Sequence, residues 1–380
     1  MREIYKKIPE LIDAGQISAY CTVVDTKGST PQVPGAKMLI LPDFRNIGTL
    51  GGGCVEAEAR KQALGLMQSG KSKLLEFQLD SDYGWDDGSI CGGIMKIFVD
   101  IPKSSETAQL FTRLQELLDA KVPVVLATIV SDNRIDGNAL GMKLLIFGDE
   151  KFGGLSDEQL EREVMLQTVE ALEENEPRLF EFQDNAVAIF IEPIQPLHTL
   201  LIAGAGHVGQ AVAKLGKMLD FEVVVVDDRP DFASRERFPD ADKIIVKDIA
   251  QTLREFPIDP LTYIVIVTRG HQHDEEALYS VIDSNARYIG MIGSRRKVKL
   301  IFKDLIERGV SKKRLQQIYS PIGLEINSKT VPEIAVSIAA QLVQVRNSKE
   351  GTGVSRKSKK ARQKATYTNI LSKDKVLVRD

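Results

Sequence analysis

Cys54 stands in a setting where a thiol can do chemistry. It precedes VEAEA, a run of good helix formers, and it follows three consecutive glycines, Gly51, Gly52 and Gly53. Backbone N–H groups converge where a helix opens after such a glycine run, and this arrangement favours an anion nest. We therefore expect Cys54 to be available as a thiolate, as a catalytic group or a soft metal ligand. Alternatively, the glycines allow close packing and Cys54 is a small buried apolar residue.

A second loop repeats this arrangement around Cys91. The acidic and aromatic segment Asp80–Asp87 lies before this cysteine, and two glycines follow it, Gly92 and Gly93. Two thiols from separate loops can share one soft metal centre. We expect Cys54 and Cys91 to act together as catalytic and metal-binding residues, with Cys91 closer to the metal. The chain has no C-x-x-C pair, and its cysteine spacing fits no common zinc finger.

The motif GAGHVG predicts a phosphate-binding turn in the second half of the chain. It follows an apolar strand pattern, precedes a helical pattern and supplies four candidate residues, Gly204, Gly206, His207 and Gly209. The glycines permit a tight turn and a close approach of the backbone to a ligand, and the helix N-terminus then faces a phosphate. The next apolar run ends at Asp227, whose carboxylate would accept a hydrogen bond from a ribose hydroxyl.

From this turn we expect an adenine nucleotide such as NAD. It should lack a 2′-phosphate, because Asp227 and Asp228 would repel that group. The alternative is a turn that binds another ligand or none, with Asp227 as the cap of its strand.

Three further segments follow predicted strands of the second half. TRGHQHDEEAL carries His271, His273 and Asp274, which could bind a metal, act as acid–base groups, or cap a helix that begins near Glu275. GMIGSRRK carries Arg295, Arg296 and Lys297, which suit either a phosphate or a solvated basic turn. SPIGL, at 320–324, is a third loop of this kind. Because ligands bind at the carboxyl ends of parallel strands, we expect TRGHQHDEEAL and SPIGL at the ligand-binding edge of the sheet.

The elements that position the cysteines are predicted to belong to one of two copies of a repeat. Residues 19–41 and 125–147 align without a gap at a constant offset of 106, and the tripeptide EFQ recurs at 76–78 and 181–183. Each half closes on an apolar run with an acid and a proline, FVDIP and then FIEP. The glycine run before Cys54 and the loop around Cys91 lack counterparts, so we expect the chemistry in the first copy.

These patterns predict an α/β chain. Its C-terminal part is a Rossmann-like, doubly wound parallel sheet at 198–346, preceded by an internally duplicated α+β domain at 1–195, with copies at about 1–102 and 103–195. The last predicted helix of the sheet domain is Val331–Arg346, because Thr330 and Glu333 have capping-box spacing. The basic segment 347–380 is expected to be a disordered tail.

Composition excludes several classes of protein. The chain has 380 residues, 43% of them hydrophobic, and no apolar run near the length of a membrane span, so we expect a cytoplasmic globular protein. Three cysteines cannot form a disulfide framework, and Cys21, in an apolar run, is predicted to be a packing residue. The net charge is −3, and the body without its basic tail is more acidic still, so nucleic acid is not an expected partner.

The chain resembles the XdhC/CoxI family of accessory proteins for xanthine dehydrogenase and related molybdenum hydroxylases. The resemblance covers about residues 1–346 and has eight ordered motifs: GSTPQVPGAKMLI, GTLGGGCVEAEA, ICGG, GAGHVG, VVDDRP, TRGHQHDEEAL, YIGMIGSRRKVK and SPIGL. After SPIGL, however, the chain has EINSKT where the family pattern leads us to expect small residues.

The resemblance implies a chaperone that binds molybdopterin (molybdenum cofactor) and protects it while its terminal sulfur is installed. The chaperone then delivers the cofactor to an apo molybdenum hydroxylase. The implied partners are that xanthine dehydrogenase-like enzyme and a cysteine desulfurase, and we expect the chaperone to be a homo-oligomer.

Two other interpretations stay open at this point. One is an NAD-dependent oxidoreductase with the cysteine-containing half as its substrate domain. The other is a nucleotide-regulated binding module without turnover. A dehydrogenase should reduce nicotinamide with some substrate, whereas a carrier should copurify with a pterin.

Overall fold

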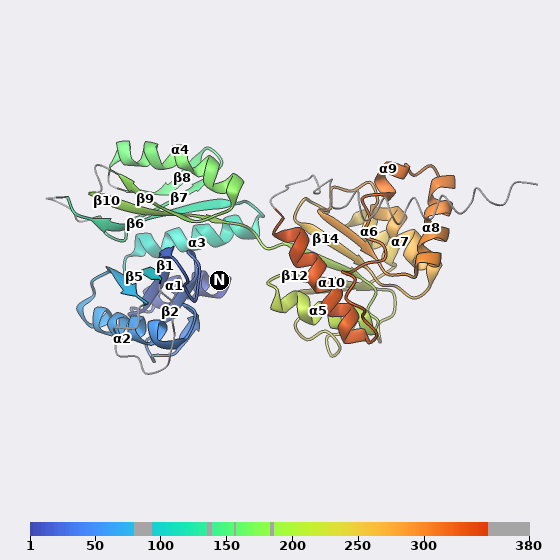
Figure 1. Ribbon diagram of the computed structural model, residues 1–380, viewed down its shortest axis with the longest axis horizontal. Coiled ribbons are helices and arrows are strands. Elements are labelled where there is room, and N and C mark those ends of the chain that lie inside the picture. The colour runs from blue at the N-terminus through green and yellow to red at the C-terminus, as the bar shows by residue number, and fades with distance from the viewer. Residues whose placement is uncertain (80–92, 135–138, 156, 183–185, 349–380) are drawn as a thin grey trace, which may run out of the picture. The chain divides into compact units, whose positions relative to one another are not determined.

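The computed structural model describes residues 1–79, 93–134, 139–155, 157–182 and 186–348. The internal contacts divide the chain into two compact units, Met1–Pro196 and Leu197–Asp380 (Figure 1). Within the described residues, no helix combines the length and the apolar character needed to cross a membrane.

The first unit contains the same series of elements twice. The first series is α1 (Arg2–Asp13), β1 (Ala19–Lys27), β2 (Lys37–Ile40), β3 (Asn46–Gly48), α2 (Gly53–Ser69), β4 (Lys73–Gln78) and β5 (Ile94–Asp100). The second series is α3 (Ser105–Asp119), β6 (Val124–Asp132), β7 (Lys143–Phe147), β8 (Glu150–Gly153), α4 (Glu158–Glu174), β9 (Arg178–Phe182) and β10 (Val187–Ile194). We refer to the two series as the first and second copy.

The two copies also share strand order and register. Each forms a five-stranded antiparallel sheet, with the orders β3-β2-β1-β5-β4 and β8-β7-β6-β10-β9. Thr22 pairs with Lys37 in the first sheet, and Thr128 pairs with Lys143 at the equivalent place in the second. The predicted internal duplication of an α+β fold is therefore confirmed.

The first unit is built in layers. Helix α2 covers one face of the first sheet and α4 one face of the second, while α1 and α3 pack together between the two sheets (Figure 1). The amphipathic pattern of α1 explains its place, because its apolar residues, including Ile4 and Ile8, face the core around Phe111 of α3. The central apolar core therefore belongs to both copies, and neither copy buries its inner face alone.

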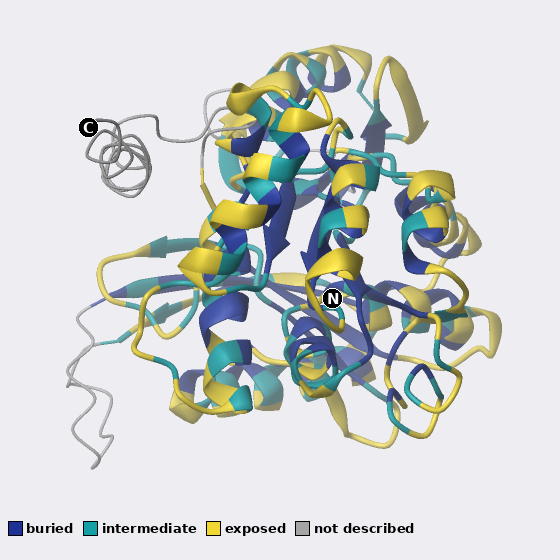
Figure 2. Cartoon of the chain, turned by 90° about the vertical axis from the view of Figure 1, so that its right-hand side faces the viewer, coloured by how far each residue is buried: buried dark blue, intermediate teal, exposed yellow. Residues whose placement is uncertain are grey.

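The second unit is a parallel α/β domain. Its elements are β11 (Thr199–Ala203), α5 (His207–Met218), β12 (Glu222–Asp227), β13 (Lys243–Val246), α6 (Ile249–Glu255), β14 (Thr262–Ile266), α7 (His271–Val281), β15 (Tyr288–Met291), α8 (Arg295–Glu307), α9 (Lys312–Leu315) and α10 (Val331–Arg346). The strand order is β13-β12-β11-β14-β15, and all pairings are parallel. Strands β11, β12, β14 and β15 are buried, the edge strand β13 is partly exposed, and the covering helices expose their outer sides (Figure 2).

Helices cover both faces of this sheet. Helices α5 and α10 pack on one face of the sheet and form one apolar core with it. Helices α6, α7 and α8 pack on the opposite face and form the other core. The predicted Rossmann-like, doubly wound fold is therefore confirmed. Helix α10 has the predicted bounds, and its capping box between Thr330 and Glu333 is formed.

One predicted boundary is wrong. The helix expected to begin near Glu275 begins at His271, because Gly270 adopts φ 86° as its N-cap and turns the chain into the helix four residues earlier. His273 and Asp274 therefore lie in the first helical turns rather than in front of the helix.

Candidate functional site

The start of α2 presents Cys54 to solvent. The three glycines before it have positive φ values of 111°, 72° and 63°, a backbone that side chains rarely adopt. Gly52 is the N-cap of the helix, and no side chain caps it. Cys54 is exposed. Cys54 therefore lies, as predicted, in the first turn of a helix that follows a glycine run, and its thiol is exposed.

Part of the expected anion nest is filled by the protein itself. The carboxylate of Glu56 accepts hydrogen bonds from the backbone N–H groups of Leu50, at 2.7 Å, and Gly52, at 3.1 Å. It also accepts a hydrogen bond of 2.5 Å from the Thr49 hydroxyl. Burial opposes ionisation of Glu56, but these hydrogen bonds outweigh it and lower the pKa of the carboxyl group. An external anion would therefore bind to the first turn of α2 itself, not to the glycine turn before it.

The helix starts of α2 and α4 share one carboxylate and differ in another, at the N-cap position. Glu161 of α4 matches Glu56, because it accepts a hydrogen bond from the Leu155 N–H at 2.9 Å. Glu161 lies 105 positions after Glu56, and at this offset of 105 Asp157 replaces Gly52. Asp157 caps α4 by accepting hydrogen bonds from the N–H groups of Gln159 and Leu160.

Arg134 adds a cation to this capped helix start. Its guanidinium lies 3.6 Å from the Asp157 carboxylate. In the second copy, Asp157 and Arg134 thus occupy the helix start. The equivalent position of the first copy, beside Cys54, has no side-chain cap.

The base of the Cys91 loop and the Gly51 turn both contact the segment 27–31. A Cβ on buried Gly93 would lie 2.4 Å from the carbonyl oxygen of Ser29, and one on Gly51 would lie 2.9 Å from the Pro31 side chain. Only glycine permits these two approaches, so the GSTP segment lies against Gly93 and the Gly51 turn. Cys91 and Gly92 are outside the described residues, so the predicted roles of Cys91 as the metal-proximal ligand and of Gly92 in cofactor binding stay predictions.

Cys21 lies in the core of the first copy, as its apolar run predicts. It is fully buried in β1, opposite Met38 and Val99. Burial, with a smaller effect from the charge of Asp100, raises the pKa of its thiol to about 12. Cys21 therefore has no thiolate character, in contrast to the exposed position of Cys54.

The three motif glycines of the second unit have separate tasks. Gly204 has φ 119°, and a Cβ there would meet the carbonyl oxygen of Val267 at 2.4 Å. A Cβ on Gly209 would meet the carbonyl oxygen of Gly204 at 2.0 Å, so this glycine lets α5 approach the strand. Gly206 has open space around its Cβ position. It caps α5 next to exposed His207 and leaves room for a ligand.

The Asp227 carboxylate, which the sequence predicts as a ribose ligand, already accepts several hydrogen bonds from the protein. Its carboxylate accepts hydrogen bonds from the Ala205 N–H, at 2.7 Å, and from two nitrogens of the Arg229 guanidinium, at 2.8 and 2.9 Å. Burial opposes its ionisation, but these partners prevail and lower the pKa of Asp227 to about 2. Its predicted contact with a ribose hydroxyl would compete with them. Asp228 is exposed and pairs with Arg269 at 2.6 Å.

The polar residues of TRGHQHDEEAL diverge in the structure. Asp274 is fully buried, accepts hydrogen bonds from the N–H (3.0 Å) and hydroxyl (2.5 Å) of Thr268, and pairs with Lys297. Burial raises the pKa of Asp274, and Lys297 and Thr268 oppose that rise. His273 instead lines a cavity of about 260 Å³ together with Asp228. The expected metal set of His271, His273 and Asp274 is thus not brought together.

The basic residues in the first turn of α8 are only partly free. Lys297 forms an ion pair with Asp274, whereas Arg295 and Arg296 are exposed. Arg295 lies 3.8 Å from Glu325, the first residue of EINSKT. This departure from the family pattern therefore places an acid beside an arginine that we expected to bind phosphate.

Helix α10 positions the SPIGL loop. The Gln341 side chain accepts a hydrogen bond from the Gly323 N–H at 2.9 Å and donates one to the Gly323 carbonyl at 3.2 Å. Gln341 also accepts the Tyr288 hydroxyl at 2.6 Å. The loop is thereby fixed at the carboxyl end of β15, next to the basic turn.

Sequence reasoning missed two functional residues at the helix starts of the two copies. Glu56 and Asp157 both act on backbone N–H groups at a helix start. The recurrence of a glutamate at the same place in both copies was a usable signal for Glu56. The same spacing of 105, which also matches Leu50 with Leu155, was a usable signal that Asp157 stands opposite Gly52.

The structure thus defines a protein of two units, a duplicated antiparallel α+β unit followed by a Rossmann-type unit. Family comparison makes the assignment specific. The XdhC and CoxI family model matches residues 11–78 and 117–183, one segment in each copy, and the XdhC Rossmann domain model matches residues 200–342. The chain belongs to the XdhC and CoxI family.

Three relatives match nearly the whole chain. A protein of Bacillus subtilis, described as a probable xanthine dehydrogenase subunit, is 28% identical, over 91% of this chain and 98% of its own length. The molybdenum cofactor insertion chaperone PaoD of Escherichia coli is 23% identical, over 91% of this chain and 88% of its own. A crystal structure described as a xanthine dehydrogenase of Bacillus halodurans is 26% identical with a TM-score of 0.75, covering 93% of this chain and 99% of that one.

Proposed function

We propose that this protein is an accessory protein of molybdenum cofactor maturation. It binds the molybdenum cofactor as cargo, protects it while its terminal sulfur is installed, and delivers it to an apo xanthine dehydrogenase-type hydroxylase. The names of its relatives, a cofactor insertion chaperone and a probable component of xanthine dehydrogenase, support the general role. A cysteine desulfurase would be the sulfur source, and apo hydroxylase the recipient.

One observation carries the location of the cargo site. The first turn of α2 lacks a side-chain cap and presents exposed Cys54, whereas Asp157 caps the equivalent turn of α4. Molybdopterin combines a phosphate with sulfur-rich metal coordination. An uncapped helix start attracts the phosphate, and a thiolate suits the metal. Cys91 would complete the pair of thiols, since the base of its loop lies on the same segment as the Gly51 turn.

The test is cofactor retention in matched variants. The protein is produced in a host that makes molybdenum cofactor, purified without oxygen, and analysed for molybdenum and for fluorescent pterin. We expect Cys54→Ala to lower both severalfold. The matched control is Gln159→Ala, which changes the equivalent position of the second copy and should retain both. Equal retention in wild type, Cys54→Ala and Cys91→Ala would reject the thiol site, and absence of pterin from wild type would reject the carrier role.

We also propose that the second unit binds an adenine nucleotide at the Gly204–Gly209 turn. Open space at Gly206 and the uncapped start of α5 support this assignment. Calorimetry with NAD, NADP, ATP and AMP tests it, and we expect micromolar binding with NADP weaker than NAD. Binding of none of them below the millimolar range would reject it. Hydride transfer to or from the nicotinamide would instead favour the oxidoreductase alternative.

A further inference from the structure

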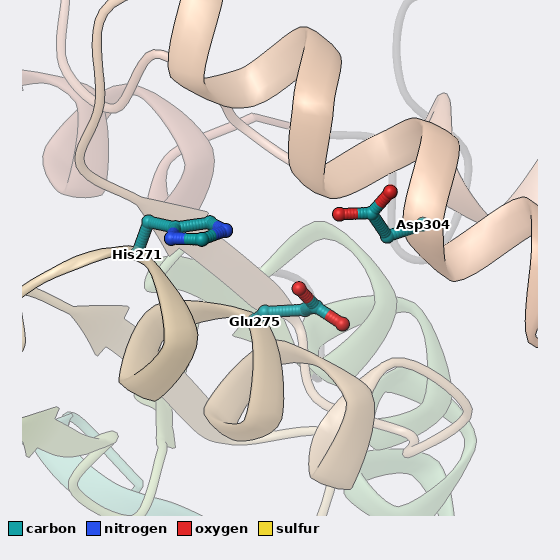
Figure 3. Close-up of side chains that lie close together, drawn as sticks. All are labelled: His271, Glu275 and Asp304. Carbon is teal, nitrogen blue, oxygen red and sulfur yellow. The ribbon is translucent and has the colours of Figure 1, made fainter.

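Three side chains of the second unit that the proposed function does not use lie together between α7 and α8. His271 and Glu275 project from α7, and Asp304 projects toward them from α8 (Figure 3). One ligand atom of each residue, a ring nitrogen or a carboxylate oxygen, lies within 4.8 Å of the others. These are nitrogen and oxygen donors, which bind divalent metal ions.

Local structure explains why the three residues meet. Positions i and i+4 of a helix lie on the same face, so the start of α7 at His271 places Glu275 directly beside it. Helices α7 and α8 pack on the same face of the sheet, and Leu278 contacts the core that contains Ile301 and Leu305. The two helices are therefore held at a spacing that the apolar core decides, with Asp304 turned toward α7.

The charges around the cluster fit a cation. Two carboxylates face one imidazole, and within the described residues no hydrogen bond or ion pair joins the His271 ring or the Asp304 carboxylate to another side chain. Arg308 already acts as a cation there, because its guanidinium lies 3.1 Å from Glu275 and 2.8 Å from Glu276. A bound metal ion would take Glu275 from Arg308, which could keep Glu276.

We propose that His271, Glu275 and Asp304 bind a divalent transition-metal ion, with Zn²⁺ preferred. Protein ligands lie about 2.0–2.2 Å from zinc, so donors of one ion are up to about 4 Å apart, and small side-chain rotations close the observed cluster. Water would complete the coordination. The imidazole nitrogen disfavours Ca²⁺ and Mg²⁺, which take oxygen ligands. The ion would tie the first turns of α7 to α8, independently of any cargo in the first unit.

The test is zinc binding by the full chain without an affinity tag, followed by calorimetry in the Cys54→Ala, Cys91→Ala background, which removes both thiols of the proposed cargo site. We expect one Zn²⁺ per chain, weaker binding of Mg²⁺, and a rise in the Tm of the second unit. His271→Ala and Asp304→Asn should each weaken zinc binding at least tenfold. The matched control is His273→Ala, a second histidine of α7 that lies outside the cluster and should change the zinc affinity less than twofold.

Arg308→Met separates a metal site from a merely structural cluster. It removes the competing cation, so it should tighten zinc binding severalfold even if it lowers the stability of the apo protein. Zinc affinity that is unchanged by both His271→Ala and Asp304→Asn, or weaker in Arg308→Met, would overturn the proposal. Failure of this site would leave cofactor retention by Cys54 unaffected, so the two proposals are tested separately.

Discussion

The Nζ atom of Lys37 donates a hydrogen bond to the carboxylate of Glu192, which lies 155 positions further along the chain in the other copy. The pair is interior, with 0% of the Lys37 side chain and 7% of the Glu192 side chain exposed. Lys143 and Asp100 form the same pair in the opposite direction, again in the interior. Each of the two equivalent lysines thus pairs with a carboxylate of the other copy. This explains why both copies have a buried lysine.

Removing one lysine should therefore be costly. Lys37→Met leaves Glu192 buried without a cation, and we expect a loss of about 3–5 kcal/mol in the free energy of unfolding. The double variant Lys37→Met, Glu192→Met should recover most of that loss, because no unpaired charge remains. Urea unfolding of the three proteins measures this. A loss below about 1 kcal/mol in Lys37→Met would contradict a structural role for the pair.

The cysteines should separate into a reactive one and a packing one. In the native protein, a thiol reagent should modify Cys54 rapidly and leave Cys21 unmodified, because burial raises the pKa of Cys21 to about 12. Cys54→Ala should leave the Tm nearly unchanged, whereas Cys21→Ser places a hydroxyl in the core and should cost about 1–3 kcal/mol. Mass spectrometry of labelled peptides and thermal unfolding provide the measurements. Fast labelling of Cys21 in the folded protein would be inconsistent with this assignment.

Asp227 should make the second unit sensitive to acid. Its folded-state pKa of about 2 lies below the usual value of 3.8, so its contribution to stability is complete above about pH 4 and is lost as pH falls toward 2. The shift corresponds to about 2 kcal/mol. We expect Asp227→Asn to be less stable than wild type at pH 6 and to approach it near pH 2. Hydrogen exchange of β11 and β12 amides measures the difference, and a difference independent of pH would refute this account.

The glycine turn should matter more for nucleotide binding than the acid beside it. Gly206 has φ −69° and free space at its Cβ position, so Gly206→Val should fold normally while its side chain blocks the ligand. Asp227→Asn should reduce affinity by one hydrogen bond to a charged group, about 1.5–3 kcal/mol. Gly209→Ala is the folding control, because its Cβ would strike the Gly204 carbonyl. Equal affinity losses in Gly206→Val and Asp227→Asn, measured by calorimetry, would argue against a ligand at this turn.

Local patterns were enough to predict the parallel sheet domain and the duplication. Val331–Arg346 was predictable to the residue, because capping boxes and helical periodicity are properties of neighbours in the chain. The offset between Lys37 and Lys143 likewise appears in the sequence as a repeat. What these two lysines do does not appear there, because each finds its carboxylate in the other copy.

Tertiary structure alone decided which candidate residues share a site. His271, His273 and Asp274 are close in sequence, yet helix geometry turns them in different directions. Asp274 forms an ion pair with Lys297 instead of joining His271. Conversely, Asp304 joins His271 only because an apolar core holds α7 beside α8. The sequence determined which chemical groups are available and which elements carry them. Distances between those groups depend on how the elements pack, and that packing is set by long-range apolar contacts that no local pattern encodes.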